Sequence, residues 1–118
     1  MEKVRLSDKF AMFSEYFTPK IIGEVNDNHI LLAKVKGEFV WHTHEEDEMF
    51  FVFKGKLLIK LRDREVGLEA GEIFVVPKGV EHCPVANEEV EIMMIEPKTT
   101  KHTGDLVTEK TVTTYERI

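Results

Sequence analysis

The stretch Trp41–Gly55, "WHTHEEDEMFFVFKG", joins two histidines and an acidic run to the start of an apolar segment. Side chains at alternate positions of an extended strand point to the same side, so His42 and His44 should project together. If residues 45–47 turn the chain, Glu48 opens the next antiparallel strand and can face back towards both imidazoles. The stretch therefore predicts two paired strands with ionisable groups gathered at one end.

Two imidazoles and a carboxylate beside an apolar interior favour a metal site, because ionisable groups are tolerated next to a core when a cation pairs them. Imidazole suits Fe, Ni, Cu and Zn. His82 is the candidate for a fourth ligand, since it follows the turn 77–79 in a strand-rich region. His29 and His102 lie in polar segments, and we expect both to be solvated.

Other interpretations of these residues are weaker. An H-x-H pair occurs often by chance, and an acidic run such as residues 45–47 is usually a solvated turn. The sequence has no H-E-x-x-H motif, no cysteine set for a zinc finger and no glycine-rich phosphate loop. Cys83 should point away from His82 and is expected to be a small packed residue. The metal hypothesis therefore depends on the whole set of residues.

Composition limits the class of protein. The chain has 118 residues, enough for one domain, and a net charge of −6 argues against nucleic acid or an anionic membrane as partner. It has one cysteine and no apolar run near the roughly 18 residues of a membrane helix. The N-terminus lacks the apolar region of a signal peptide. We expect a cytoplasmic protein.

Most of the chain has the pattern of short strands between turn signals. About eight such strands predict an all-β sandwich or barrel. The segment 48–61, "EMFFVFKGKLLIKL", predicts two strands of a hairpin that turn near Gly55. Residues 6–17 predict one short helix with Ser7 as its N-cap, ended by Pro19.

Two segments of the sequence resemble the motifs of the cupins. The first cupin motif, G-(x)5-H-x-H-(x)3,4-E-(x)6-G, is matched by "GEFVWHTHEEDEMFFVFKG" (37–55), except that Gly37 stands one residue too close to His42. The second, G-(x)5-P-x-G-(x)2-H-(x)3-N, is matched by "GEIFVVPKGVEHCPVAN" (71–87), except that Asn87 falls one residue late. The resemblance is to the small single-domain type labelled "cupin 2, conserved barrel".

The resemblance implies a double-stranded β-helix, or jelly-roll barrel, in a single domain spanning 1–118. Around a core barrel of about 28–97 we expect an N-terminal helix and arm over 1–27 and a tail over 98–118. The resemblance also implies one divalent transition metal per chain (Fe, Mn, Ni, Zn or Cu). The ligands that it implies are His42, His44, Glu48 and His82.

Cupins include oxygenases, isomerases and binding modules, so the fold does not fix the function. We expect a metal-dependent enzyme, of oxygenase or isomerase type, acting on an unknown small molecule. The alternatives are a metal-dependent binding module without catalysis and a structural barrel without chemistry. No catalytic residue is assigned.

The walls of a ligand pocket should come from apolar residues, none of which is preferred over the ordinary core. An apolar cavity favours an aromatic or diketone-like ligand over a sugar phosphate. The sequence shows no basic cluster for a phosphate, although Lys34, Lys60 or Arg62 could supply one charge. The candidate wall residues are Phe39, Phe50, Ile59, Phe74 and either Met93 or Met94.

The strand around residues 50–53 is apolar on both faces, because Phe51 and Phe53 alternate with Phe50 and Val52. Such a strand must be covered on both sides. We expect the outer cover to be a second subunit in a homodimer, as the resemblance to cupins also implies.

Overall fold

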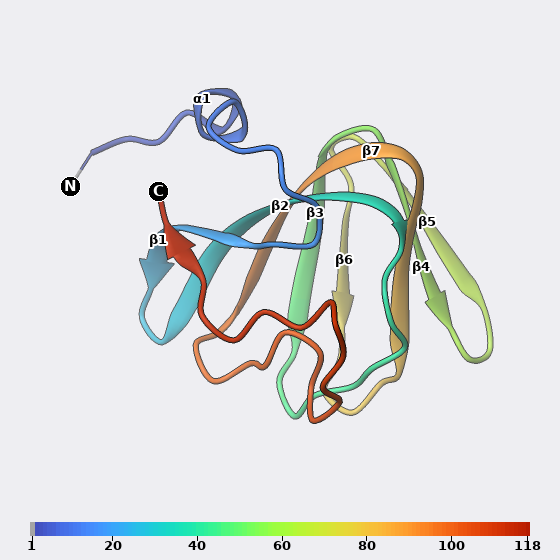
Figure 1. The fold of residues 1–118 in the computed structure, drawn as a ribbon. Coiled ribbons are helices and arrows are strands. Elements are labelled where there is room, and N and C mark those ends of the chain that lie inside the picture. The colour runs from blue at the N-terminus through green and yellow to red at the C-terminus, as the bar shows by residue number, and fades with distance from the viewer. Residues whose placement is uncertain (1) are drawn as a thin grey trace.

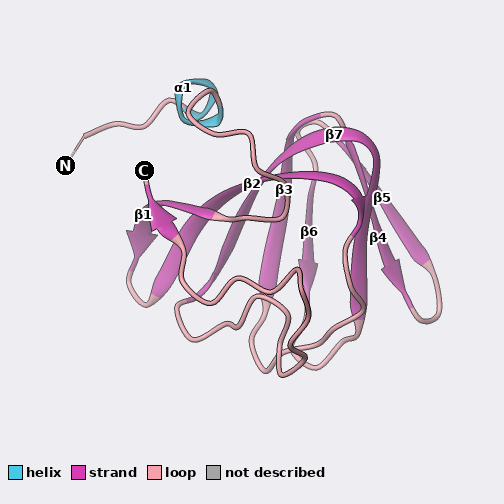
Figure 2. Cartoon of the chain, viewed as in Figure 1, coloured by secondary structure: helices cyan, strands magenta, loops and turns pink. Residues whose placement is uncertain are grey.

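A computed structural model describes residues 2–118 and confirms an all-β protein with a short N-terminal helix (Figures 1 and 2). No helix within these residues is long and apolar enough to cross a membrane. The elements are α1 (Leu6–Phe10), β1 (Lys20–Val25), β2 (Asn28–Glu38), β3 (Glu48–Lys54), β4 (Lys56–Leu61), β5 (Glu65–Glu69), β6 (Ile73–Val76), β7 (His82–Pro97) and β8 (Glu116–Arg117).

Strand β7 organises the sheet. It has 16 residues and pairs along one edge with β2, from Asn28↔Pro97 to Glu38↔Val85. Along its other edge it pairs first with β4 and then with β3. Within residues 2–118 the strands form one sheet of eight, which is not closed into a ring. The jelly-roll is therefore open at its edges.

The segment 48–61 does not form the predicted hairpin. β3 and β4 do not pair with each other, and both run antiparallel to β7. Gly55 turns a corner between them with φ +96°, and a Cβ at this position would lie 2.9 Å from the Glu89 carbonyl oxygen. Gly55 does mark a turn of the chain, as predicted, but the turn is a corner where two backbones approach closely and not a hairpin. The hairpin of this region joins β4 to β5 instead.

The core lies inside the curved sheet. Alternate residues of the strands face inward, as in β3, where Phe50 and Val52 are buried. Cys83 is also fully buried, in line with a packing role.

The N-terminal arm covers part of the outer face. Helix α1 begins at Leu6 and its N-cap is Arg5, without a side-chain cap, so Ser7 lies inside the helix and the predicted cap is wrong. Phe10 is buried and stacks on Phe53, with ring centroids 5.3 Å apart. Phe53 therefore has its cover from its own chain rather than from a second subunit.

The C-terminal tail lies across one end of the sheet, which is at the bottom of Figure 1. Gly104 packs against the loop after β2 so closely that a Cβ would lie 1.9 Å from the Thr43 carbonyl oxygen. Further along, β8 pairs in parallel with β1, so tail and arm meet. The limits predicted for arm, barrel and tail stay a prediction.

We still expect a homodimer, now through the part of the outer face that α1 leaves bare. Ile73 and Val75 on the edge strand β6 are 58% and 48% exposed. Exposed apolar side chains on an edge strand favour pairing with another chain. Light scattering at micromolar concentration should give a dimer mass.

The variant Ile73→Lys should shift that mass towards the monomer. Met12→Lys is the control, because Met12 is equally exposed, at 60%, but lies on the N-terminal arm. A monomeric wild-type protein would remove the expectation.

Candidate metal centre

Two of the predicted ligands lie opposite each other in a short backbone pairing. Strand β2 ends at Glu38, so the predicted strand through His44 survives only as one bridge between His42 and His82. Each backbone N–H of this pair donates to the carbonyl of the other, at 3.1 and 3.0 Å. The two imidazole ring centroids are consequently 4.3 Å apart.

The loop that carries His44 is held by the turn before His82. The Gly79 N–H donates to the His44 carbonyl at 2.9 Å, and the Lys78 N–H donates to Asp47 Oδ1 at 2.8 Å. Asp47 was expected to be a solvated turn residue, yet it ties the two motif loops together. Glu48 follows as the first residue of β3 and is buried.

Each of the three histidines makes the same local hydrogen bond. In each ring Nδ1 lies 2.9 Å from a backbone carbonyl oxygen two residues away, at Val40, Glu46 and Val80. A carbonyl can only accept, so Nδ1 carries a proton, and in the neutral ring Nε2 keeps a free lone pair. Such bonds typically orient metal-ligating imidazoles.

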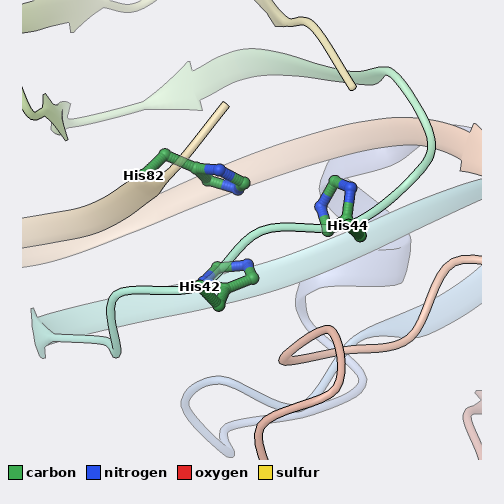
Figure 3. Close-up of side chains that lie close together, drawn as sticks. All are labelled: His42, His44 and His82. Atoms are coloured by element: carbon green, nitrogen blue, oxygen red, sulfur yellow. The ribbon is translucent and has the colours of Figure 1, made fainter. Parts of the chain in front are cut away.

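The free nitrogens converge. One ligand atom from each of His42, His44 and His82 lies within 4.8 Å of the others, and the rings face one another in Figure 3. Nε2 of His44 and of His82 is buried with no hydrogen-bond partner among the described residues. Buried polar atoms without partners are costly, so the cluster fits a metal ion, which would satisfy them. The three imidazoles are thus positioned to bind a metal.

Glu48 adds a negative charge to the cluster. Its Oε1 lies 3.4 Å from His82 Nε2 and 3.6 Å from His44 Nε2. Burial acts to lower the pKa of His44, but the nearby Glu48 carboxylate outweighs it and raises that pKa. Burial, together with the charge of His82, lowers the pKa of His42 to about 4. Such a carboxylate can offset the charge of a bound cation.

Sequence reasoning missed a second carboxyl group, Glu96. It is buried beside Glu48 and acts to lower the pKa of that carboxyl. Burial and the charge of Glu48 raise the pKa of Glu96, which favours the neutral form of this carboxyl. Its position was readable, because Glu96 has the same parity as the buried Ile92 and Met94 of β7.

Known proteins place this geometry in a family. The cupin domain family (Cupin_2) matches residues 29–96, more than half of the chain. The chain belongs to the cupins. A cupin-2 domain protein of Shewanella frigidimarina has a similar structure, with a TM-score of 0.79 and 50% identity over 80% of this chain and 94% of that one.

Two curated relatives are also similar to this cupin. The uncharacterized protein YdbB of Bacillus subtilis is 40% identical over 65% of this chain and 64% of its own length. A 3-hydroxyanthranilate 3,4-dioxygenase of Xenopus tropicalis is 27% identical over 59% of this chain and 28% of its own length. The matches thus span less than two thirds of either relative.

A chamber inside the cupin fold reaches the histidine cluster. Its lining residues are Phe17, Pro19, Ala33, Val35, Phe39, His42, Glu48, Phe50, Pro84, Ile92, Met94, Glu96, His102 and Tyr115. Three of the predicted wall residues are therefore present (Phe39, Phe50 and Met94). Of the alternatives Met93 and Met94, it is Met94 that lines the chamber. Ile59 and Phe74 do not line it, because Ile59 packs in the core and Phe74 lies elsewhere on the sheet.

His102 was expected to be solvated, and this was wrong. Its ring packs against Phe39, with centroids 4.9 Å apart, and its Nδ1 accepts a hydrogen bond from the Val112 N–H. Burial lowers the pKa of His102 to about 4. No local pattern pointed to this role, since Phe39 lies far away in the sequence. His29 lies half-buried in β2, outside the cluster.

We expect His44→Ala to lower metal affinity by more than about 100-fold, because even residues that only support metal ligands are worth roughly 10–100-fold. Elemental analysis after dialysis against limiting metal checks this. His29→Ala is the matched control and should keep wild-type metal content. Equal metal content in both variants would contradict the assignment of His44 as a ligand.

The lowered pKa of His102 predicts loss of stability in acid. Between pH 6.5 and about 4 the unfolded chain binds a proton at His102 that the folded protein excludes. The free energy of unfolding therefore decreases as the pH is lowered through this range. His102→Gln in the metal-free protein should reduce this fall by roughly 2 kcal/mol at pH 4. Urea unfolding at pH 7 and pH 4 measures the difference.

The comparison needs His29→Gln as a control, which should keep most of the wild-type pH dependence. Identical pH profiles for wild type and His102→Gln would show that His102 is free to ionise in the folded state.

Proposed function

We propose that this cupin is a metal-dependent enzyme, of oxygenase type, that acts on a small molecule held in the chamber. The observation that carries the proposal is that His42 and Glu48 line the chamber. A molecule bound there lies beside the histidine cluster.

His42, His44, Glu48 and His82 would hold one divalent transition metal. Three imidazoles and a carboxylate suit Fe, Mn, Ni, Zn or Cu. When bound, such a metal supplies Lewis-acid or redox activation of a substrate oxygen or of O₂.

The residues of the chain have roles of their own in this proposal. The apolar walls of the chamber exclude water from the bound molecule and so strengthen polar interactions there. Glu96, buried next to Glu48 in the wall of the chamber, would hold the Glu48 carboxylate in place. Glu96 is therefore a positioning residue for the candidate ligand.

The dioxygenase relatives favour the hypothesis of an oxygenase over that of an isomerase. Their matches cover about a quarter of their own length, so they support the class of chemistry and not a particular substrate.

A metal-dependent binding module is the second candidate. The position of the tail favours the binding module. Gly104 packs tightly against Thr43 at the end of the sheet that carries the histidines, and the tail would enclose a ligand there. Substrate-dependent O₂ uptake discriminates the two. An oxygenase consumes O₂ in proportion to the product formed. A binding module shows only stabilisation of the protein by its ligand, without O₂ uptake.

Anaerobic loading with Fe(II) followed by nitric oxide tests whether a ligand position is open. Catalytic metal sites keep one position for water or substrate, whereas structural sites are filled by protein. We expect an iron–nitrosyl signal by electron paramagnetic resonance at about one equivalent per bound iron. The Zn(II)-loaded protein, treated identically, is the control. Stoichiometric iron without this signal would mean a closed site and would remove the oxygenase proposal.

A further inference from the structure

The C-terminal tail forms a second cavity, which lies between the tail and the first two strands of the sheet. The tail crosses this end of the sheet as the orange and red loops of Figure 1. We call the cavity the tail groove. It is lined by Ile21 of β1, His29 of β2 and residues of the tail between Lys98 and Tyr115. Most of its lining therefore lies outside residues 29–96, which match the cupin family.

The tail groove is separate from the chamber. His102 and Tyr115 line both cavities, and their rings meet edge-on with centroids 6.0 Å apart. The candidate ligands His42, His44, Glu48 and His82 do not line the groove. The groove is therefore a neighbour of the candidate metal centre and not a part of it.

The tail groove is cationic, although the protein as a whole is acidic. The chain has a net charge of −6. Among the described residues that line the groove, however, Lys98 and Lys101 are the charged ones, and none is an aspartate or a glutamate. A concave surface lined by one sign of charge attracts ligands of the opposite sign. The groove thus favours an anionic ligand.

The two lysines remain available to such a ligand. Lys101 Nζ lies 3.2 Å from Asp105, whose side chain is 98% exposed, and an exposed ion pair of this kind contributes little to stability. Lys98 Nζ lies 2.8 Å from one carboxyl oxygen of Glu24, and Arg117 lies 2.6 Å from the other. Because one carboxylate faces two cations, a positive charge is left over beside the groove.

Thr100 adds a hydrogen-bond donor that has no partner. The residue is only 9% exposed, and its Oγ1 has no hydrogen-bond partner among the described residues. A buried hydroxyl in this state is costly. Thr100 and Lys98 share the turn that follows β7, in which the Thr100 N–H donates to the Pro97 carbonyl at 3.0 Å. A carboxylate can only accept, so one carboxylate can take hydrogen bonds from both side chains.

Apolar side chains of the tail line another part of the groove. Leu106 and Val107 are 48% and 84% exposed, and they are neighbours in the chain. Covering them with an apolar ligand would remove their surface from water, which is favourable. The groove thus combines a cationic, hydrogen-bonding part with an apolar part.

We propose that the tail groove binds a small organic acid that has one carboxylate and a short apolar chain. The carboxylate accepts hydrogen bonds from the Lys98 ammonium and the Thr100 hydroxyl. The apolar chain packs against Leu106 and Val107. This site is additional to the proposed enzyme activity, and binding to it does not require the metal.

Hexanoate, acetate and hexanol test the proposal by isothermal titration calorimetry on the Zn(II)-loaded protein. Hexanoate has both the charge and the chain and should bind best. Acetate lacks the chain and should bind at least about tenfold more weakly. Hexanol lacks the charge and should bind roughly tenfold more weakly. Acetate or hexanol binding as tightly as hexanoate would overturn the proposal.

Variants test the two polar contacts. Lys98→Gln removes the charge and should weaken hexanoate binding roughly fivefold. Thr100→Val removes the hydroxyl at similar shape and should have a similar effect, of roughly fivefold. Lys56→Gln is the matched control and should keep wild-type affinity, because Lys56 is also a surface lysine beside a glutamate, 3.6 Å from Glu69, but does not line the groove.

If Thr100→Val does not fold, the exposed position Lys98 still decides. Wild-type affinity in Lys98→Gln, or in a folded Thr100→Val, would overturn the proposal.

Carboxylates also bind metal ions, so the position of hexanoate must be distinguished from the chamber. On adding hexanoate, the backbone ¹H–¹⁵N signals of Thr100, Leu106 and Val107 should shift, in the metal-free and in the Zn(II)-loaded protein alike. Shifts that need the metal and centre on the histidine cluster would place hexanoate on the metal and overturn the proposal. Hexanoate binding in the groove of a protein that binds no metal would support this site and refute the metal-dependent enzyme.

Discussion

The site depends on one repeated interaction, the hydrogen bond from a histidine Nδ1–H to a backbone carbonyl two residues away. His42, His44 and His82 each make it at 2.9 Å. These bonds fix the tautomer and turn the three Nε2 atoms towards one another. Buried lone pairs that face each other are unfavourable without a cation, and the Glu48 carboxylate is itself an acceptor and cannot satisfy them. The fold thus holds an arrangement that a metal ion stabilises.

Long-range pairing assembles these local units. The His42–His82 bridge brings the two motif loops together, and Gly79 and Asp47 lock the second loop to the first. Around this shared core, the arm and tail add the wall that a ligand would contact. Membership of the family therefore accounts for the histidine cluster, and the segments outside the family match add residues to the lining of the chamber.

The sequence predicted the parts of the site whose spacing is local. Alternation along extended chain placed His42 and His44 on one side, and the same parity in β7 would have found Glu96. The hairpin predicted at Gly55 was wrong, because a glycine between two apolar segments is expected both at a hairpin and at a corner. The sequence does not show that both strands pair with β7, and this pairing makes Gly55 a corner. His102 could not be predicted, because its partner Phe39 is distant in the sequence and no periodicity links them.

We infer that the backbone orients three imidazoles with free Nε2 atoms before any metal binds. Long-range ¹H–¹⁵N correlation spectra of the metal-free protein measure the tautomer of each histidine ring. We predict that the proton lies on Nδ1 in the neutral rings of His42, His44 and His82. A neutral ring with its proton on Nε2 at any of the three positions would show that this nitrogen is not oriented to bind a metal and would contradict the inference.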